Sequence, residues 1–121
     1  MLPGRTVAVT TLLTLAGLGL ASCSSDEKNA AADVKVTACT PDPAGGRPSA
    51  QGRITNNSSK ASAYAFRVSF IDTAGNKVSE GAVAVADVEA GGNAIWRTQG
   101  AADAKGRLTC SETDVTRTAV Q

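Results

Sequence analysis

The stretch ASAYAFRVSFID, residues 61–72, decides the fold predicted for this chain. Its large side chains recur at every second position: Tyr64, Phe66, Val68 and Phe70. Side chains of a β-strand alternate between the two faces of its sheet, so the pattern predicts a central strand with an aromatic-rich buried face. Arg67 falls on the opposite face, where we expect a solvated charge.

Further strands are predicted on both sides of this segment, separated by turns rich in Gly, Pro, Asn and Ser. Their ranges are 33–39, 49–55, 77–85, 93–98 and 108–119. The alanine-rich residues 82–90 also fit a helix, but the alternation at 83–85 and the flanking glycines favour a strand. In the last segment the apolar register slips before Val115, which predicts a β-bulge. About seven short strands at regular spacing predict an all-β fold, an antiparallel β-sandwich.

Residues 1–22 are predicted to be an export leader. Arg5 is the only charged residue before Asp26, and residues 7–20 form an apolar run that includes three threonines. The run has 14 residues, whereas a membrane-spanning helix needs about 20. A transmembrane anchor remains an alternative, as does a plain secretory signal.

The apolar run ends in Leu20-Ala21-Ser22-Cys23, which fills four successive positions of a lipobox. This predicts cleavage before Cys23 and attachment of a diacylglycerol to its sulfur, because a thiolate is the nucleophile that takes the lipid. Small residues at Ala21 and Ser22 let a peptidase close around the backbone. Stable anchoring by two or more acyl chains then places the protein on the outward-facing side of the cell membrane.

Cys39 and Cys110 remain once Cys23 carries a lipid. An exported chain meets an oxidising environment, so an even pair predicts a disulfide, worth about 4 kcal/mol in the chain-entropy model. The alternative is a catalytic or metal-binding thiol, but the chain has no histidine that could act with it as a base or a metal ligand.

Charge and composition divide the chain into a leader, a tether at 23–32 and a domain at 33–119. The tether is small and polar, which indicates a flexible spacer. Beyond the leader, acidic and basic residues balance. There is thus no net basic field for nucleic acid, and no overall charge bias toward an acidic lipid surface. We expect a monomer.

Several of the segments above resemble the FxLYD-type domain of bacterial, notably actinobacterial, lipoproteins. They are GRITNNSS at 52–59, FRVSFID at 66–72 with Gly75, VEAG at 88–91, and Trp96. The resemblance covers roughly residues 33–119. It implies an Ig-like β-sandwich, and it carries over no catalytic residues.

Each candidate site residue in the domain also has a purely structural interpretation. Trp96 fits a core position or a ligand-stacking platform. Asp72 and Asp114 fit metal ligands, but Asp72 is better placed as a turn former before a glycine. The run NNSS at 56–59 matches a glycosylation sequon, and we interpret it as a tight turn. No calcium-loop spacing occurs, so no metal or cofactor is predicted.

The sequence therefore predicts a membrane-anchored lipoprotein with a non-enzymatic interaction or structural module of the cell envelope. Without histidine or a free thiol, the chain offers few candidates for base and nucleophile chemistry. The expected partner is an envelope protein or polymer. A small-ligand carrier, or an accessory domain of an envelope enzyme or transporter, is the alternative, and a carrier would need a concave pocket of a few hundred cubic ångströms.

Overall fold

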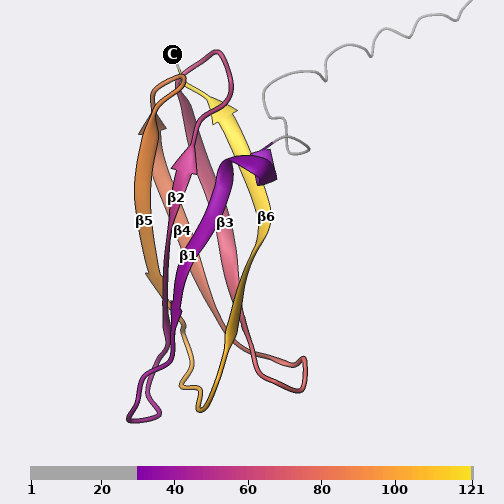
Figure 1. Ribbon diagram of the computed structural model, residues 1–121. Coiled ribbons are helices and arrows are strands. Elements are labelled where there is room, and N and C mark those ends of the chain that lie inside the picture. The colour runs from indigo at the N-terminus through magenta and orange to yellow at the C-terminus, as the bar shows by residue number, and fades with distance from the viewer. Residues whose placement is uncertain (1–29, 121) are drawn as a thin grey trace, which may run out of the picture.

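Six strands in two layers make up the part of the chain that the structure describes, residues 30–120 (Figure 1). The structure is a computed structural model. A short 3-10 turn, η3 (Ala31–Asp33), precedes the first strand. The strands are β1 (Val34–Thr40), β2 (Ser49–Thr55), β3 (Ser62–Ile71), β4 (Lys77–Val88), β5 (Asn93–Gln99) and β6 (Thr109–Ala119).

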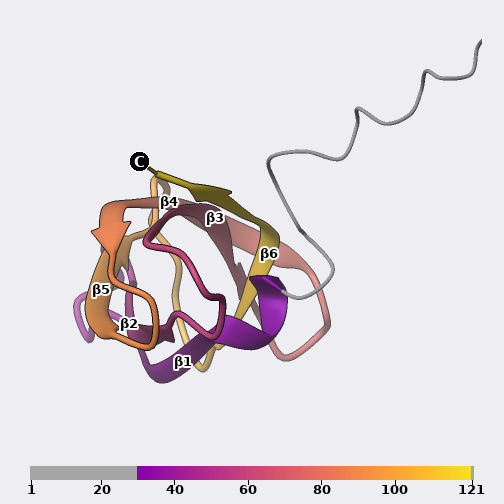
Figure 2. The same cartoon turned by 90° about the horizontal axis from the view of Figure 1, so that it is seen from above.

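The strands form two antiparallel sheets of three, with the orders β1-β2-β5 and β4-β3-β6. Seen from above, the two sheets face each other as separate layers (Figure 2). The predicted all-β sandwich is therefore confirmed. It has six strands where about seven were expected, and each strand overlaps one of the six ranges named from the sequence. The helical alternative for residues 82–90 is wrong, because β4 continues as a strand to Val88.

The core lies between the sheets and is built around β3. Tyr64, Phe66, Val68 and Phe70 are all buried, as their period-two spacing predicted. The opposite sheet contributes Ile54 and Trp96, and the Phe66 and Trp96 rings meet edge to face at 5.2 Å. Such an edge-to-face pair adds about 0.5–1.5 kcal/mol beyond the area that it buries.

Register shifts mark β-bulges on the edge strands β1, β4 and β6, and the bulges on β6 and β1 decide which residues of those two strands face inward. On β6, Ala65 pairs with Thr116 but Arg67 pairs with Thr113, so one extra residue of β6 lies between them. Asp114 lies in this bulge with a φ of 54°, and the predicted bulge is confirmed. The bulge on β1, between Val36 and Ala38, was not predicted.

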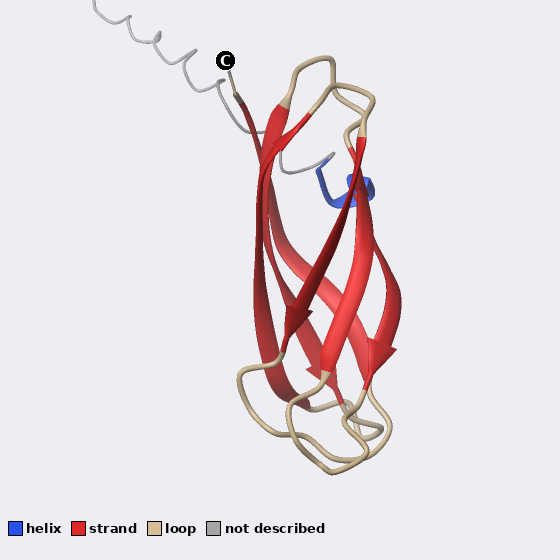
Figure 3. Cartoon of the chain, turned by 90° about the vertical axis from the view of Figure 1, so that its left-hand side faces the viewer, coloured by secondary structure: helices blue, strands red, loops and turns tan. Residues whose placement is uncertain are grey.

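The loops gather at two opposite ends of the sandwich (Figure 3). One end holds η3 and the loops at 56–61 and 89–92. We call it the tether end, because the described chain starts there. The distal end holds the loops at 41–48, 72–76 and 100–108. Within residues 30–120, no helix has the length and apolar character to cross a bilayer.

Candidate functional site

The lipobox residues lie outside the described residues. Leu20, Ala21, Ser22 and Cys23 precede residue 30, where the description begins. Lipidation at Cys23 therefore stays a prediction from the sequence. What the structure gives is the domain that the tether would hold. This domain begins before the predicted boundary at residue 33, because Ala30 is buried in the core and η3 spans Ala31–Asp33.

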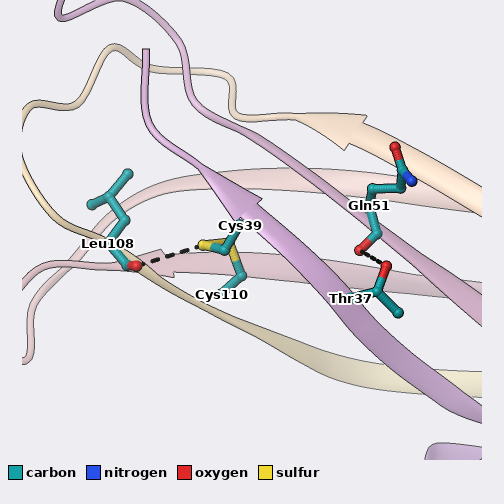
Figure 4. Close-up of a disulfide and its surroundings, with 5 residues drawn as sticks. All are labelled: Thr37, Cys39, Gln51, Leu108 and Cys110. Atoms are coloured by element: carbon teal, nitrogen blue, oxygen red, sulfur yellow. Dashed lines mark hydrogen bonds between the residues drawn. A yellow bond between two sulfur atoms is a disulfide. The ribbon is translucent and has the colours of Figure 1, made fainter. Parts of the chain in front are cut away.

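The second predicted site is a disulfide, and it is confirmed. Cys39 of β1 and Cys110 of β6 are bonded at 2.02 Å across a sequence separation of 71 residues (Figure 4). The Leu108 carbonyl oxygen lies 3.7 Å from Cys39 Sγ. Because a disulfide sulfur carries no proton, we treat this approach as a contact only. The bond joins the first strand of one sheet to the last strand of the other.

Both cysteines depend on the bulges to face the interior. Val34 and Val36 point inward from β1, and strict alternation would turn Cys39 outward. The β1 bulge restores an inward direction. Likewise Val115 is buried on β6, and the bulge beside it brings Cys110 to the same side.

A buried polar cluster, which the sequence reasoning missed, occupies the tether end. It consists of the buried residues Asp33, Tyr64 and Arg117 together with the exposed Asn57, and we call it the Asp33 cluster. Tyr64 Oη and Arg117 Nη1 donate to Asp33 Oδ2 at 2.5 and 2.7 Å, and Asn57 Nδ2 donates to Asp33 Oδ1 at 2.8 Å. Asp33 is 3 % exposed.

Three donors hold the Asp33 carboxylate in its charged form. Burial raises the pKa of Asp33, but the hydrogen bonds from Tyr64, Asn57 and Arg117, together with the Arg117 charge, outweigh burial and leave it below 3.8. Burial, and then the hydrogen bond to Asp33 and its charge, raise the pKa of Tyr64 to about 12. The same carboxylate holds the pKa of Arg117 above its ordinary value against the effect of burial.

The Asp33 cluster fastens the start of the domain rather than presenting reactive groups. The Asp33 carboxylate accepts hydrogen bonds on both of its oxygens from side chains of other segments, so both oxygens are engaged. β1 is thereby held to β6 at both ends, by this ion pair at the tether end and by the disulfide at the distal end. The sequence signal was Arg117, a charged residue two positions from the inward-facing Val115.

Trp96 is a core residue and not a ligand-stacking platform on the surface. It is 3 % exposed, and Gly52 lies directly opposite it on β2. A Cβ at Gly52 would stand 2.4 Å from the Trp96 ring and 1.9 Å from the Lys35 carbonyl oxygen. The glycine is therefore what lets the indole pack flat against β2. The Trp96 Nε1 donor is buried without a hydrogen-bond partner.

The two aspartates considered as metal ligands have structural positions. Asp72 Oδ1 accepts hydrogen bonds from the amides of Ala74 and Asn76 at 3.0 and 2.9 Å, so Asp72 forms the turn predicted for it. Asp114 occupies the β6 bulge. Among residues 30–120, no three His, Cys, Asp or Glu side chains come together as a metal-binding group.

The NNSS run is a tight turn, as interpreted. Asn56 is fully buried, and its Nδ2 donates to the carbonyl oxygens of Lys60 and Val88 at 2.9 and 2.8 Å. Its Oδ1 accepts from the amide and the hydroxyl of Ser58. The side chain thus ties the 56–61 loop to the end of β4.

Three hollows of the described surface are open to solvent. Two, of about 490 and 260 Å³, lie over the Ala- and Thr-rich outer face of the β4-β3-β6 sheet. The third, of about 290 Å³, lies between the 42–45 and 105–106 loop segments at the distal end. None of the three is enclosed, and a carrier would need a hollow deep enough to bury most of its ligand.

Comparison of this chain with protein-family models, with curated proteins and with solved structures gives no match.

Proposed function

We propose that this chain is a lipid-anchored protein of the bacterial cell envelope, and that its β-sandwich is a non-enzymatic interaction or structural module. The observation that carries the proposal is the order Leu20-Ala21-Ser22-Cys23, then a short polar tether, then a disulfide-closed sandwich. Disulfides persist in oxidising compartments, which supports export of the domain. The proposed location is the outward-facing side of the cell membrane.

We further propose that the sandwich is Ig-like and of the FxLYD type. The strand orders β1-β2-β5 and β4-β3-β6 fit strands A, B and E facing strands C′, C and F of an immunoglobulin domain. The disulfide differs from that of antibody domains, because it joins the first strand to the last instead of strands B and F.

A non-enzymatic role is supported by how the polar groups are used. The buried carboxylate of Asp33 is held by three donors, and Asp72 is bound to its own turn. Within this proposal the domain is a monomer that binds an envelope protein or polymer through its loops or an exposed strand edge.

The anchoring half of the proposal is tested by growth with labelled palmitate. We expect label in the wild-type chain and none in Cys23→Ala, which should also be uncleaved or released from membranes. Ser24→Ala is the matched control, and it should keep both the label and the membrane fraction. Label retained by Cys23→Ala would overturn the anchoring.

The interaction half is tested by capture from intact membranes. We expect an envelope protein or polymer to be recovered with the wild-type chain above the level found on a matrix that carries no chain. Recovery of nothing above that background would contradict an interaction role. A thermal-shift screen that finds a strongly stabilising small molecule would favour the carrier function instead.

A further inference from the structure

The near-neutral balance of the chain conceals a separation of charge between the two sheets. Strands β1, β2 and β5 carry three basic residues and no acidic one: Lys35, Arg53 and Arg97. Strands β3, β4 and β6 carry four acidic residues: Glu80, Asp87, Glu112 and Asp114. They also carry three basic residues, of which Arg117 is buried against Asp33.

The basic residues share the outer face of their sheet. Lys35 pairs with Arg53, and Arg53 pairs with Ile95, so these three form one row across the sheet. Arg97 pairs with Gln51 in the next outward row, and its Nη2 donates to Gln51 Oε1 at 2.7 Å. All three basic side chains are exposed. We call this set, Lys35, Gln51, Arg53, Ile95 and Arg97, the basic face.

The basic face also carries an exposed apolar side chain at its centre. Ile95 is 61 % exposed, and it is the exposed large hydrophobic residue of the described chain. It lies directly beside Arg53. An apolar residue among cations is the composition of surfaces that bind at a bilayer interface, where the apolar group enters the headgroup layer and the cations meet anionic lipids.

The position of the basic face puts it within reach of an anchored membrane. The row of Lys35, Arg53 and Ile95 lies in the half of the sheet nearest the tether end (Figure 1). Lys35 stands twelve positions after Cys23. Twelve extended residues span at most about 40 Å, so an anchor at Cys23 holds Lys35 within about 40 Å of the lipid surface.

We propose that the basic face lies against the anionic headgroups of the membrane that holds the chain, so that the domain rests on its β1-β2-β5 sheet. The outer face of the β4-β3-β6 sheet then points away from the bilayer and is free to meet a partner. The choice of a membrane as occupant rests on the anchoring proposed above, whereas the separation of charge does not.

The test measures which face of the domain touches the bilayer. The full chain carrying Cys23→Ser is mixed with vesicles, so that contact of the domain with the bilayer is measured without lipidation. A fluorophore is attached through Ile95→Cys or, as the opposite-face control, through Ala65→Cys. We expect quenching by lipid-borne quencher at position 95 and not at 65, in vesicles containing phosphatidylglycerol at low salt.

Two matched double variants distinguish an effect of the basic face from an effect of the net charge of the chain. Lys35→Gln with Arg53→Gln removes one lysine and one arginine from the basic face. Arg67→Gln with Lys77→Gln removes the same two types from the other sheet. Each surface cation changes membrane binding about fivefold, so the first pair should lower the ratio of bound to free domain about 30-fold. The second pair should leave that ratio within about twofold.

Three results would overturn the proposal. They are equal quenching at positions 95 and 65, quenching that persists in phosphatidylcholine vesicles, and equal losses in the two double variants. Release of the position-95 fluorophore by soluble polyglutamate, at a charge concentration below that of the lipid, would also overturn it and assign the face to an anionic polymer. Absence of palmitate label would refute the anchoring alone and leave this measurement unaffected.

Discussion

Replacement of Asp33 by asparagine tests the buried cluster that fastens the start of the domain. Asparagine keeps the size of the side chain but removes the charge that Tyr64 and Arg117 face. Removing one partner of a buried ion pair costs about 3–5 kcal/mol, and asparagine retains part of the hydrogen bonding. We therefore expect a loss of about 3 kcal/mol in the free energy of unfolding, from a total of about 5–15 for a domain of this size.

The assay is urea unfolding at pH 7, followed by the emission of Trp96, the single tryptophan of the chain. A loss of 3 kcal/mol should also lower the melting temperature by about 12–24 °C. Asp103→Asn, in the exposed distal loop, is the control and should change the unfolding free energy by less than about 0.5 kcal/mol. Tyr64→Phe should cost about 1.5–3 kcal/mol and should not add fully to Asp33→Asn, because both remove the same bond.

The pH dependence of the free energy of unfolding is a second test of the role of Asp33. The pKa of Asp33 is lowered in the folded protein, so its contribution to stability is present above pH 3.8 and is lost as the pH falls through the folded value. The gap between wild type and Asp33→Asn should therefore narrow between pH 6 and pH 2. A gap that stays constant over this range, or a variant as stable as Asp103→Asn at pH 7, would refute the account of the cluster.

Three other changes test how the sandwich is held together. Cys39→Ala with Cys110→Ala should lose about 4 kcal/mol in urea unfolding, and reductant should do the same to the wild type; no loss in either would contradict the role of the disulfide. Gly52→Ala should destabilise the domain by about 3 kcal/mol, because its Cβ would meet the Lys35 carbonyl oxygen at 1.9 Å; an unchanged melting temperature would show that the close contact is absent. Asp114→Val should cost about 2 kcal/mol at a φ of 54°, whereas Asp114→Gly should not; equal stability of the two variants would argue against the left-handed bulge.

The sequence predicted those features of the fold that depend on local periodicity. The aromatic alternation of residues 64–70 identified the central strand, and the slip before Val115 identified the bulge of β6. The bulge of β1 left the same signal, because Cys39 has the opposite parity to Val34 and Val36, yet it was missed. When a disulfide-bonded cysteine lies an odd number of residues from the other inward-facing residues of its strand, the sequence therefore predicts a β-bulge between them.

Features that need three-dimensional neighbours could not be predicted from the sequence. Asp33 and Arg117 are 84 residues apart and meet only because β1 and β6 border the same open side of the sandwich. The basic face was not predicted for a similar reason. Lys35, Arg53 and Arg97 lie far apart along the chain, and the net charge of the chain does not show that they share one face. Sheet order brought them together, and sheet order follows from long-range pairing that residue patterns do not encode.

The mass of the native protein recovered from membranes tests the central claim most directly. We predict a chain that begins at Cys23, carries a diacylglycerol on that residue, and lacks the two hydrogens that the bond between Cys39 and Cys110 removes. A full-length, lipid-free chain that starts at Met1 with three reduced thiols would contradict it.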